Sequence, residues 1–166
     1  MKLISGNKKR EIVEQVLLQN YNKYYRLAYS YVHNEADAGD IVQNGAYKAI
    51  LNSSKLRNIE FVETWIYRIM VNEIFQNYRG QTDLLPEDSI PEKGKEDVYQ
   101  NLDLKRALDS LEKEDKTVII LRYYEDMRLE DIAIVLNENL STIKSRLYRS
   151  MKKLKLKLEP YEESIR

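Results

Sequence analysis

Residues 129–158 read LEDIAIVLNENLSTIKSRLYRSMKKLKLKL, and their pattern predicts two helices joined by a tight turn. Ile132, Val135 and Leu136 suit the buried face of the first helix. Asn137 stands where a residue that tolerates the left-handed conformation is needed, and Ser141 is the expected N-cap of the second helix. This pattern is typical of a helix-turn-helix, whose second helix enters the major groove of DNA.

The second helix, expected over residues 141–158, divides into an apolar face and a basic face. Its predicted core stripe is Ile143, Leu147, Met151 and Leu154. The side chains left toward solvent or DNA are Thr142, Lys144, Ser145, Arg146, Arg149 and Lys153. Residues 142–158 hold seven basic residues and no acidic one. Because Arg pairs with guanine and Lys neutralises phosphate, this face predicts DNA binding. Lys155 and Lys157 are instead interpreted as solvating the end of the helix.

The rest of the chain also predicts helices. Apolar residues recur at helical spacing over residues 11–31, 35–51 and 59–79, a polar loop covers 52–58, and Gly80 is placed to stop the third helix. Further helices are expected over 102–111, 113–124 and 129–136. Residues 81–103 carry seven acidic and two basic residues. The expected fold is therefore all-α, with two small helical domains at 1–80 and 104–166 joined by a flexible acidic linker at 81–103.

Several classes of function are disfavoured by the composition. The chain has no cysteine and only one histidine, His33, so neither a thiolate nor a multi-histidine metal site can be built. No phosphate-binding or dinucleotide-binding glycine motif is present, and we expect no cofactor and no enzymatic activity. No apolar run reaches the roughly 18 residues that span a bilayer, and we expect a cytoplasmic protein without direct membrane insertion.

Three segments carry a resemblance to a known family: residues 25–50, YRLAYSYVHNEADAGDIVQNGAYKAI; residues 61–79, FVETWIYRIMVNEIFQNYR; and residues 107–154. The last contains Thr142, Lys144, Ser145, Arg146, Leu147 and Arg149 on the pattern T-V-K-S-R-L-x-R-A. Over nearly its whole length the chain resembles the extracytoplasmic-function class of bacterial sigma factors. The resemblance implies a factor that binds core RNA polymerase and directs promoter-specific initiation in response to an extracytoplasmic or stress signal.

The resemblance also implies roles for particular residues. In the first domain, helical spacing places a polar stripe of Asp40, Gln43, Asn44 and Tyr47 on the outer side of its helix, and the resemblance implies that this stripe binds core polymerase. A row of Arg68, Asn72, Gln76 and Arg79 would serve minus-10 recognition. The loop at about 52–60 would capture a flipped base. In the second domain, Ser141, Thr142, Lys144, Ser145, Arg146, Arg149 and Lys153 would read the minus-35 element. Trp65 and Ile69 are interpreted as core residues.

Some residues depart from the family pattern, and some roles stay open. Gly45 replaces an acid in mid-helix, and Glu73 places a negative charge beside the minus-10 row. The resemblance implies an anti-sigma partner, and it implies that the acidic linker threads through polymerase channels, although a plain solvated tether explains its composition equally well. Two other functions compete: a helix-turn-helix regulator that binds operator DNA alone, and a scaffold whose helices bind only protein.

Overall fold

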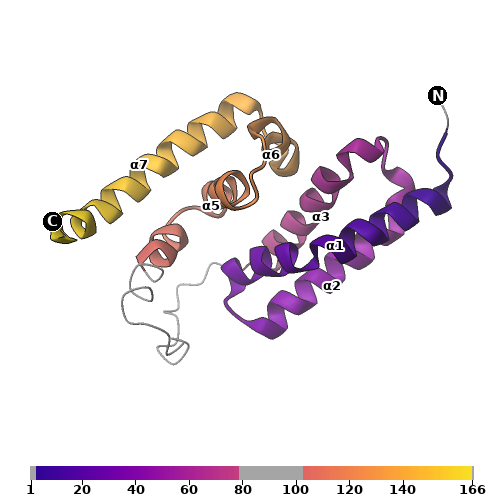
Figure 1. The fold of residues 1–166 in the computed structure, drawn as a ribbon, viewed down its shortest axis with the longest axis horizontal. Helices are drawn as coiled ribbons and strands as arrows, with labels where there is room; N and C mark the ends of the chain where they lie inside the picture. Colours follow the sequence, from indigo (N-terminus) through magenta and orange to yellow (C-terminus); the bar gives the residue numbers. More distant parts are fainter. Residues whose placement is uncertain (1–2, 79–102, 166) are drawn as a thin grey trace. The chain divides into compact units, whose positions relative to one another are not determined.

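The structure is a computed structural model that describes residues 3–78 and 103–165. These residues are helical with short connections, and no strand occurs among them, which confirms the all-α prediction. They form two compact units (Figure 1): helices α1, α2 and α3 make the N-terminal unit, and α5, most of α6 and α7 make the C-terminal unit. Arg79, the stop at Gly80 and the predicted linker, apart from Asp103, lie outside the described residues.

Helix α1 (Gly6–Val32) begins five residues before the predicted start at residue 11. Ser5 provides the reason, because its side-chain oxygen accepts a hydrogen bond from the backbone N–H of Lys8 at 3.3 Å. The helix ends at His33, which adopts the left-handed conformation with φ 51° and donates its N–H to the Tyr29 carbonyl at 2.9 Å.

Helix α2 (Glu35–Leu51) has the predicted bounds. The Asn34 side chain caps it by accepting from the N–H of Asp37 at 3.0 Å. Its inner face is formed by Ala38, Ile41, Val42 and Ala49, which are buried, and by Ala46, which is half-buried. Gly45 has a packing role, since a Cβ added there would lie 2.5 Å from Sδ of Met70 on α3. The absence of a Cβ at Gly45 therefore makes room for the Met70 side chain between the two helices.

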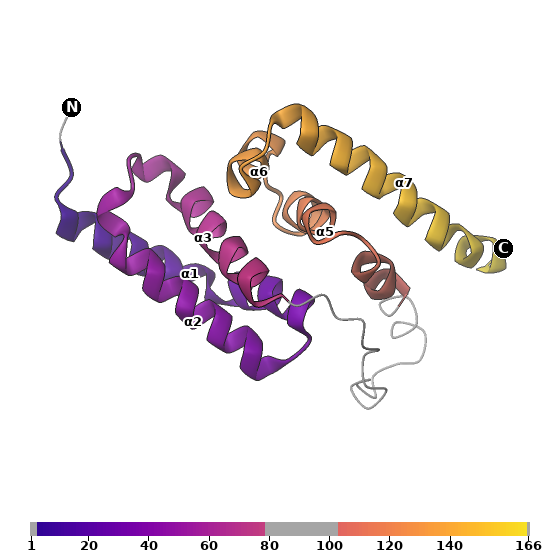
Figure 2. The ribbon, with the colours of Figure 1, turned by 180° about the vertical axis from the view of Figure 1, so that it is seen from behind.

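Helix α3 (Val62–Asn77) follows two 3₁₀ turns, η1 (Ser53–Lys55) and η2 (Ile59–Phe61). It is shorter than the predicted helix over residues 59–79, because η2 occupies residues 59–61 and α3 ends at Asn77. Leu56, which is 2% exposed, anchors the connection to the core. The three helices lie side by side in both views (Figures 1 and 2), and Ile66, Met70 and Ile74 of α3 fill the space between them.

The C-terminal unit begins with a helical stretch over residues 103–109, followed by α5 (Lys113–Ile119) and by η4 (Ile120–Tyr124), a turn with π-helical hydrogen bonding. The buried Lys116 of α5 donates to Asp109 at 2.7 Å and so ties α5 to the preceding helix. Burial lowers the pKa of Lys116, while the bond to Asp109 opposes that change.

The helix-turn-helix is present as predicted. Helix α6 (Leu129–Leu136) has the predicted bounds, and Asn137 adopts the left-handed conformation with φ 55°. Helix α7 (Leu140–Ile165) differs at both ends, starting one residue before Ser141 and continuing past residue 158. Ser141 therefore lies in the first turn of α7, and its prediction as the N-cap was wrong.

The buried stripe of α7 is shifted from the predicted one. Ile143 and Leu154 are buried and Leu147 is half-buried, but Met151 is 42% exposed and Ser150 is fully buried in its place. A straight helix returns to the same face after seven residues, which selects position 150 over 151. Leu147 and Leu154 pack against a cluster formed by Ala107, Leu108, Leu111 and Ile119.

Ser150→Ala is expected to stabilise the protein by about 0.5–1.5 kcal/mol. The buried Ser150 hydroxyl has no hydrogen-bond partner, so alanine removes a desolvated polar group and also favours the helix. Urea denaturation followed by circular dichroism measures the change, with the exposed Ser145→Ala as a control for helix propensity alone. Equal effects of the two substitutions would show that burial of the Ser150 hydroxyl contributes nothing.

Candidate nucleic-acid and protein interfaces

The basic face of α7 lies on the solvent side of the C-terminal unit. Most of the residues predicted to read DNA are exposed: Ser141, Lys144, Ser145, Arg149 and Lys153, while Thr142 is half-buried. Together they can donate hydrogen bonds to phosphates and to base edges. None of the ion pairs among the described residues involves Lys144 or Lys153, so their charges are available to an anionic ligand.

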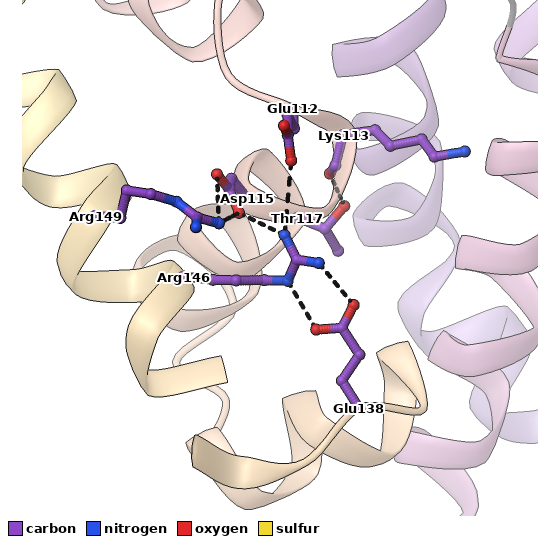
Figure 3. Close-up of polar contacts among 7 residues, drawn as sticks. All are labelled: Glu112, Lys113, Asp115, Thr117, Glu138, Arg146 and Arg149. Carbon is purple, nitrogen blue, oxygen red and sulfur yellow. Dashed lines mark hydrogen bonds and ion pairs between the residues drawn. The ribbon is translucent and has the colours of Figure 1, made fainter. Parts of the chain in front are cut away.

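Arg146 differs from that group, because its side chain is only 18% exposed and is held by carboxylates (Figure 3). Its Nε and Nη2 donate to Glu138 at 2.7 and 3.0 Å, and its Nη1 donates to Asp115 at 2.8 Å. Glu138 and Asp115 raise the pKa of Arg146 above its usual value, even though burial opposes the shift. The prediction that Arg146 lies on the exposed face was wrong: the residue links α5, the turn and α7.

Tyr148 is a candidate DNA contact that the sequence analysis missed. It lies on the same solvent side of α7 as Lys144 and Ser145, and it is 75% exposed. Its ring can stack or make apolar contact, and its hydroxyl can donate or accept. The signal available in the sequence was its helical position away from Ile143 and Leu154, which the sequence analysis did not use.

The polar stripe of α2 is exposed along its length. Asp40, Gln43, Asn44 and Tyr47 all point away from the core, and Tyr47 is 64% exposed. The outward orientation predicted from spacing is therefore confirmed. A row of one carboxylate, two amides and one phenol on a helix offers hydrogen bonds and one negative charge to a protein partner.

A pocket of about 460 Å³ opens beside this stripe. Its lining residues come from the ends of α1 and α3 and from α2: Tyr31, Val32, Asp37, Asp40, Ile41, Asn44, Asn77 and Tyr78. Tyr78 packs edge-on against Tyr31, with ring centroids 5.8 Å apart. Two carboxylates and two amides at one opening favour a basic side chain over an acidic one.

The row on α3 is exposed at each described position, namely Arg68, Asn72 and Gln76. Trp65 and Ile69, predicted as core residues, are half-buried. Glu73 does not disturb the row, because it is 5% exposed and forms an ion pair with Lys48 of α2. Lys48 also lies 3.5 Å from the side-chain oxygen of Gln76. The negative charge next to Asn72 is thus directed inward and neutralised.

The connection between α2 and α3 presents polar side chains around a fixed centre. Leu56 is buried, while Lys55, Arg57 and Asn58 are exposed. The Asn58 side chain accepts from the N–H of Glu60 at 3.0 Å, which fixes the start of η2. An anchored loop with exposed basic and amide groups can contact a single-stranded nucleic acid.

A helix-turn-helix whose second helix is basic and free of acidic residues over 142–158 is typical of a DNA-binding protein, and the three-helix unit before it adds an exposed polar stripe. Residues 16–83 match Sigma-70 region 2, and residues 101–154 match Sigma-70 region 4. The chain belongs to the bacterial RNA polymerase sigma factors, in their extracytoplasmic-function class. It is thus a factor that directs RNA polymerase to promoters.

Individual relatives agree with this membership. RNA polymerase sigma factor SigV of Bacillus subtilis is 43% identical over 139 residues, which cover 81% of this chain and 84% of SigV. ECF RNA polymerase sigma factor SigW of the same organism is 28% identical, covering 82% and 83%. Sigma factor RpoE of Bartonella quintana, solved with the anti-sigma factor NepR, has the same fold with a TM-score of 0.71 at 24% identity, covering 88% and 96%.

Proposed function

We propose that the two units divide promoter recognition, with α7 reading the minus-35 element and the α3 row with the 52–60 loop serving the minus-10 element. The proposed domains are region 2 at 1–80, the linker at 81–103 and region 4 at 104–166. The observation that carries the proposal is the basic face of α7, whose residues 142–158 include no acidic residue, in a chain that belongs to the sigma factors. The residues that would contact the minus-35 element are Ser141, Thr142, Lys144, Ser145, Tyr148, Arg149 and Lys153. Arg146 would support this surface indirectly, by linking α5, the turn and α7.

The α2 stripe is the proposed contact with core polymerase. Its exposure, its single carboxylate and the acidic pocket beside it suit a basic, hydrogen-bonding partner surface. In the N-terminal unit, Arg68, Asn72 and Gln76, with Arg79 outside the described residues, would contact the separated strands. Arg57 and Lys55 would hold the phosphates next to a captured base.

An anti-sigma factor is the second proposed partner. The solved relatives that support it are RpoE with the anti-sigma factor NepR, and CnrH with the cytosolic domain of CnrY, which has a TM-score of 0.69 at 20% identity and covers 89% of this chain. Pull-down of this protein from cells before and after stress would test it. Recovery of core polymerase alone under both conditions would contradict this partner.

The proposed place and mode of action follow from the partners. We place the factor in the cytoplasm, where core polymerase meets DNA, and we assign it no enzymatic activity because sigma factors act by binding. None of the described helices is long and apolar enough to cross a bilayer.

Transcription in vitro tests the function directly. Purified core polymerase and fragmented genomic DNA should give new, discrete start sites with shared upstream elements only when this protein is added. On such a promoter, Lys144→Ala is expected to lower transcription about tenfold, since a base contact is worth roughly 1–3 kcal/mol. Lys155→Ala, on the same helix, should change it less than about twofold.

The opposite outcome is also defined. Tight binding of this protein alone to operator-like DNA, with no new start sites, would favour an independent helix-turn-helix regulator. Equal losses in Lys144→Ala and Lys155→Ala would mean that α7 contributes charge only, and that its predicted reading of the minus-35 element is wrong.

A further inference from the structure

Asp115 is a buried carboxylate that contacts two arginines of the DNA-binding helix. It lies in the first turn of α5 and is 0% exposed. It accepts from Nη1 of Arg146 at 2.8 Å and from Nη2 of Arg149 at 3.1 Å to one oxygen and 3.4 Å to the other (Figure 3). A carboxylate so far from water requires cationic partners, so these contacts are strongly favoured in the folded state.

The two arginines differ in how many of their N–H donors remain available to a ligand. Arg146 uses its Nε and both Nη atoms on Asp115 and Glu138, and Glu112 lies 3.8 Å from its Nη1. Arg149 is 52% exposed, and its contacts with Asp115 involve Nη2 alone. Asp115 therefore holds one nitrogen of the Arg149 guanidinium and leaves the other donors of Arg149 for a ligand.

This arrangement reduces the freedom of an otherwise flexible side chain. An exposed arginine loses rotamer entropy when it binds a ligand, and a side chain that is already held loses less. A planar guanidinium held at one nitrogen has fewer orientations open to its other donors, and those donors suit paired hydrogen bonds to guanine or phosphate. A held Arg149 should therefore bind its DNA contact more tightly and discriminate better between bases.

We propose that Asp115 is a positioning residue for minus-35 recognition, acting through Arg149. This inference rests on the proposed function of α7. Asp115 contacts no DNA itself, because it is buried on α5 behind the recognition helix. It sets the orientation in which Arg149 meets the promoter, while its bond to Arg146 holds α5 and α7 together.

A double-mutant cycle in the complete holoenzyme tests the proposal. The measured quantity is the ratio of transcription from a promoter with an intact upstream element to that from the same promoter with the element substituted. Asp115→Asn is expected to lower this ratio about fivefold, which corresponds to about 1 kcal/mol. In an Arg149→Ala background the same substitution should change the ratio by less than about twofold, because Arg149, through which Asp115 acts on the DNA, is absent.

Glu114→Gln is the matched control, since it removes the same charge from the neighbouring position of α5 and should leave the ratio unchanged. An equal effect of Asp115→Asn in both backgrounds would overturn the proposal, because the effect would then pass through Arg146 or the fold. A wild-type holoenzyme that does not discriminate the upstream element would instead refute the proposed function of α7, so the two failures are distinguishable.

A measurement on the wild-type chain covers the case in which Asp115→Asn fails to fold. Nitrogen NMR of arginine side chains in the full-length protein should show slow guanidinium rotation and protected Nη hydrogens for Arg149, in contrast to the exposed Arg57. If Arg149 is as mobile as Arg57, Asp115 does not hold it, and the proposal is overturned.

Discussion

Arg146→Ala is expected to destabilise the C-terminal unit by about 3 kcal/mol. The substitution removes the bonds to Glu138 and the shorter of the two arginine contacts of the buried Asp115. Breaking a buried ion pair by removing one partner costs roughly 3–5 kcal/mol, and the partial exposure of Glu138 places this case at the lower end. For a unit of this size the melting temperature should fall by more than about 10 °C, as measured by calorimetry or circular dichroism.

Two control variants separate structure from DNA contact. Lys144→Ala removes a basic residue from the same helix and should leave the melting temperature unchanged, because Lys144 is exposed. Arg146→Lys should recover little of the stability, because the ammonium group of lysine cannot make the hydrogen bonds that the Arg146 guanidinium donates to Glu138 and Asp115. If Arg146→Ala melts like the wild type but transcribes poorly, the original interpretation of Arg146 as a DNA reader is correct and the structural one is wrong.

The helices were predictable where local chemistry sets their limits. Asn34 supplies a capping oxygen and Leu51 ends the apolar period, so the bounds of α2 could be predicted from the sequence. The helix-turn-helix was equally visible, because Asn137 follows one short amphipathic stretch and precedes another. The α2 stripe was placed correctly because a helix with one apolar side has only one way to face the core.

Tertiary pairing was not predictable in the same way. Asp115 lies 31 residues before Arg146, and nothing in their local sequences connects them. A basic residue on a basic helix therefore looked like a ligand contact, although carboxylates of α5 and the turn bind it. Glu73 is the converse case: an acid beside the minus-10 row looked exposed, but it is buried against Lys48. In both cases the partner belongs to another element, and the helical period cannot identify it.

Small errors of register had a different cause. The predicted stripe of α7 was built from apolar residues, so it included Met151 and did not include the polar Ser150. The geometry of the helix instead buries Ser150 and exposes Met151. A buried serine without a partner violates the usual pattern, which is why composition alone could not find it. The position coincides with the alanine of the family pattern T-V-K-S-R-L-x-R-A, and that coincidence was the available signal.

Asp40→Arg is expected to weaken binding to core polymerase at least about 100-fold. Asp40 is exposed, lines the acidic pocket beside α2 and takes part in none of the described ion pairs. Reversal of its charge would replace attraction to a basic partner surface by repulsion, and like charges placed together at an interface cost several kcal/mol. Fluorescence anisotropy of the labelled protein titrated with core polymerase at fixed salt measures the change.

Two controls test whether unfolding or the change in total charge explains the weaker binding of Asp40→Arg. Asp40→Arg should melt like the wild type, because no described bond to its side chain is lost. Glu11→Arg makes the same charge change on an exposed position of α1 in the same unit, and it should lower the affinity less than about threefold. Equal losses for the two variants would indicate a general electrostatic attraction between the unit and polymerase. Unchanged affinity of Asp40→Arg would exclude the α2 stripe as the docking surface, because a reversed charge cannot be neutral inside a close interface.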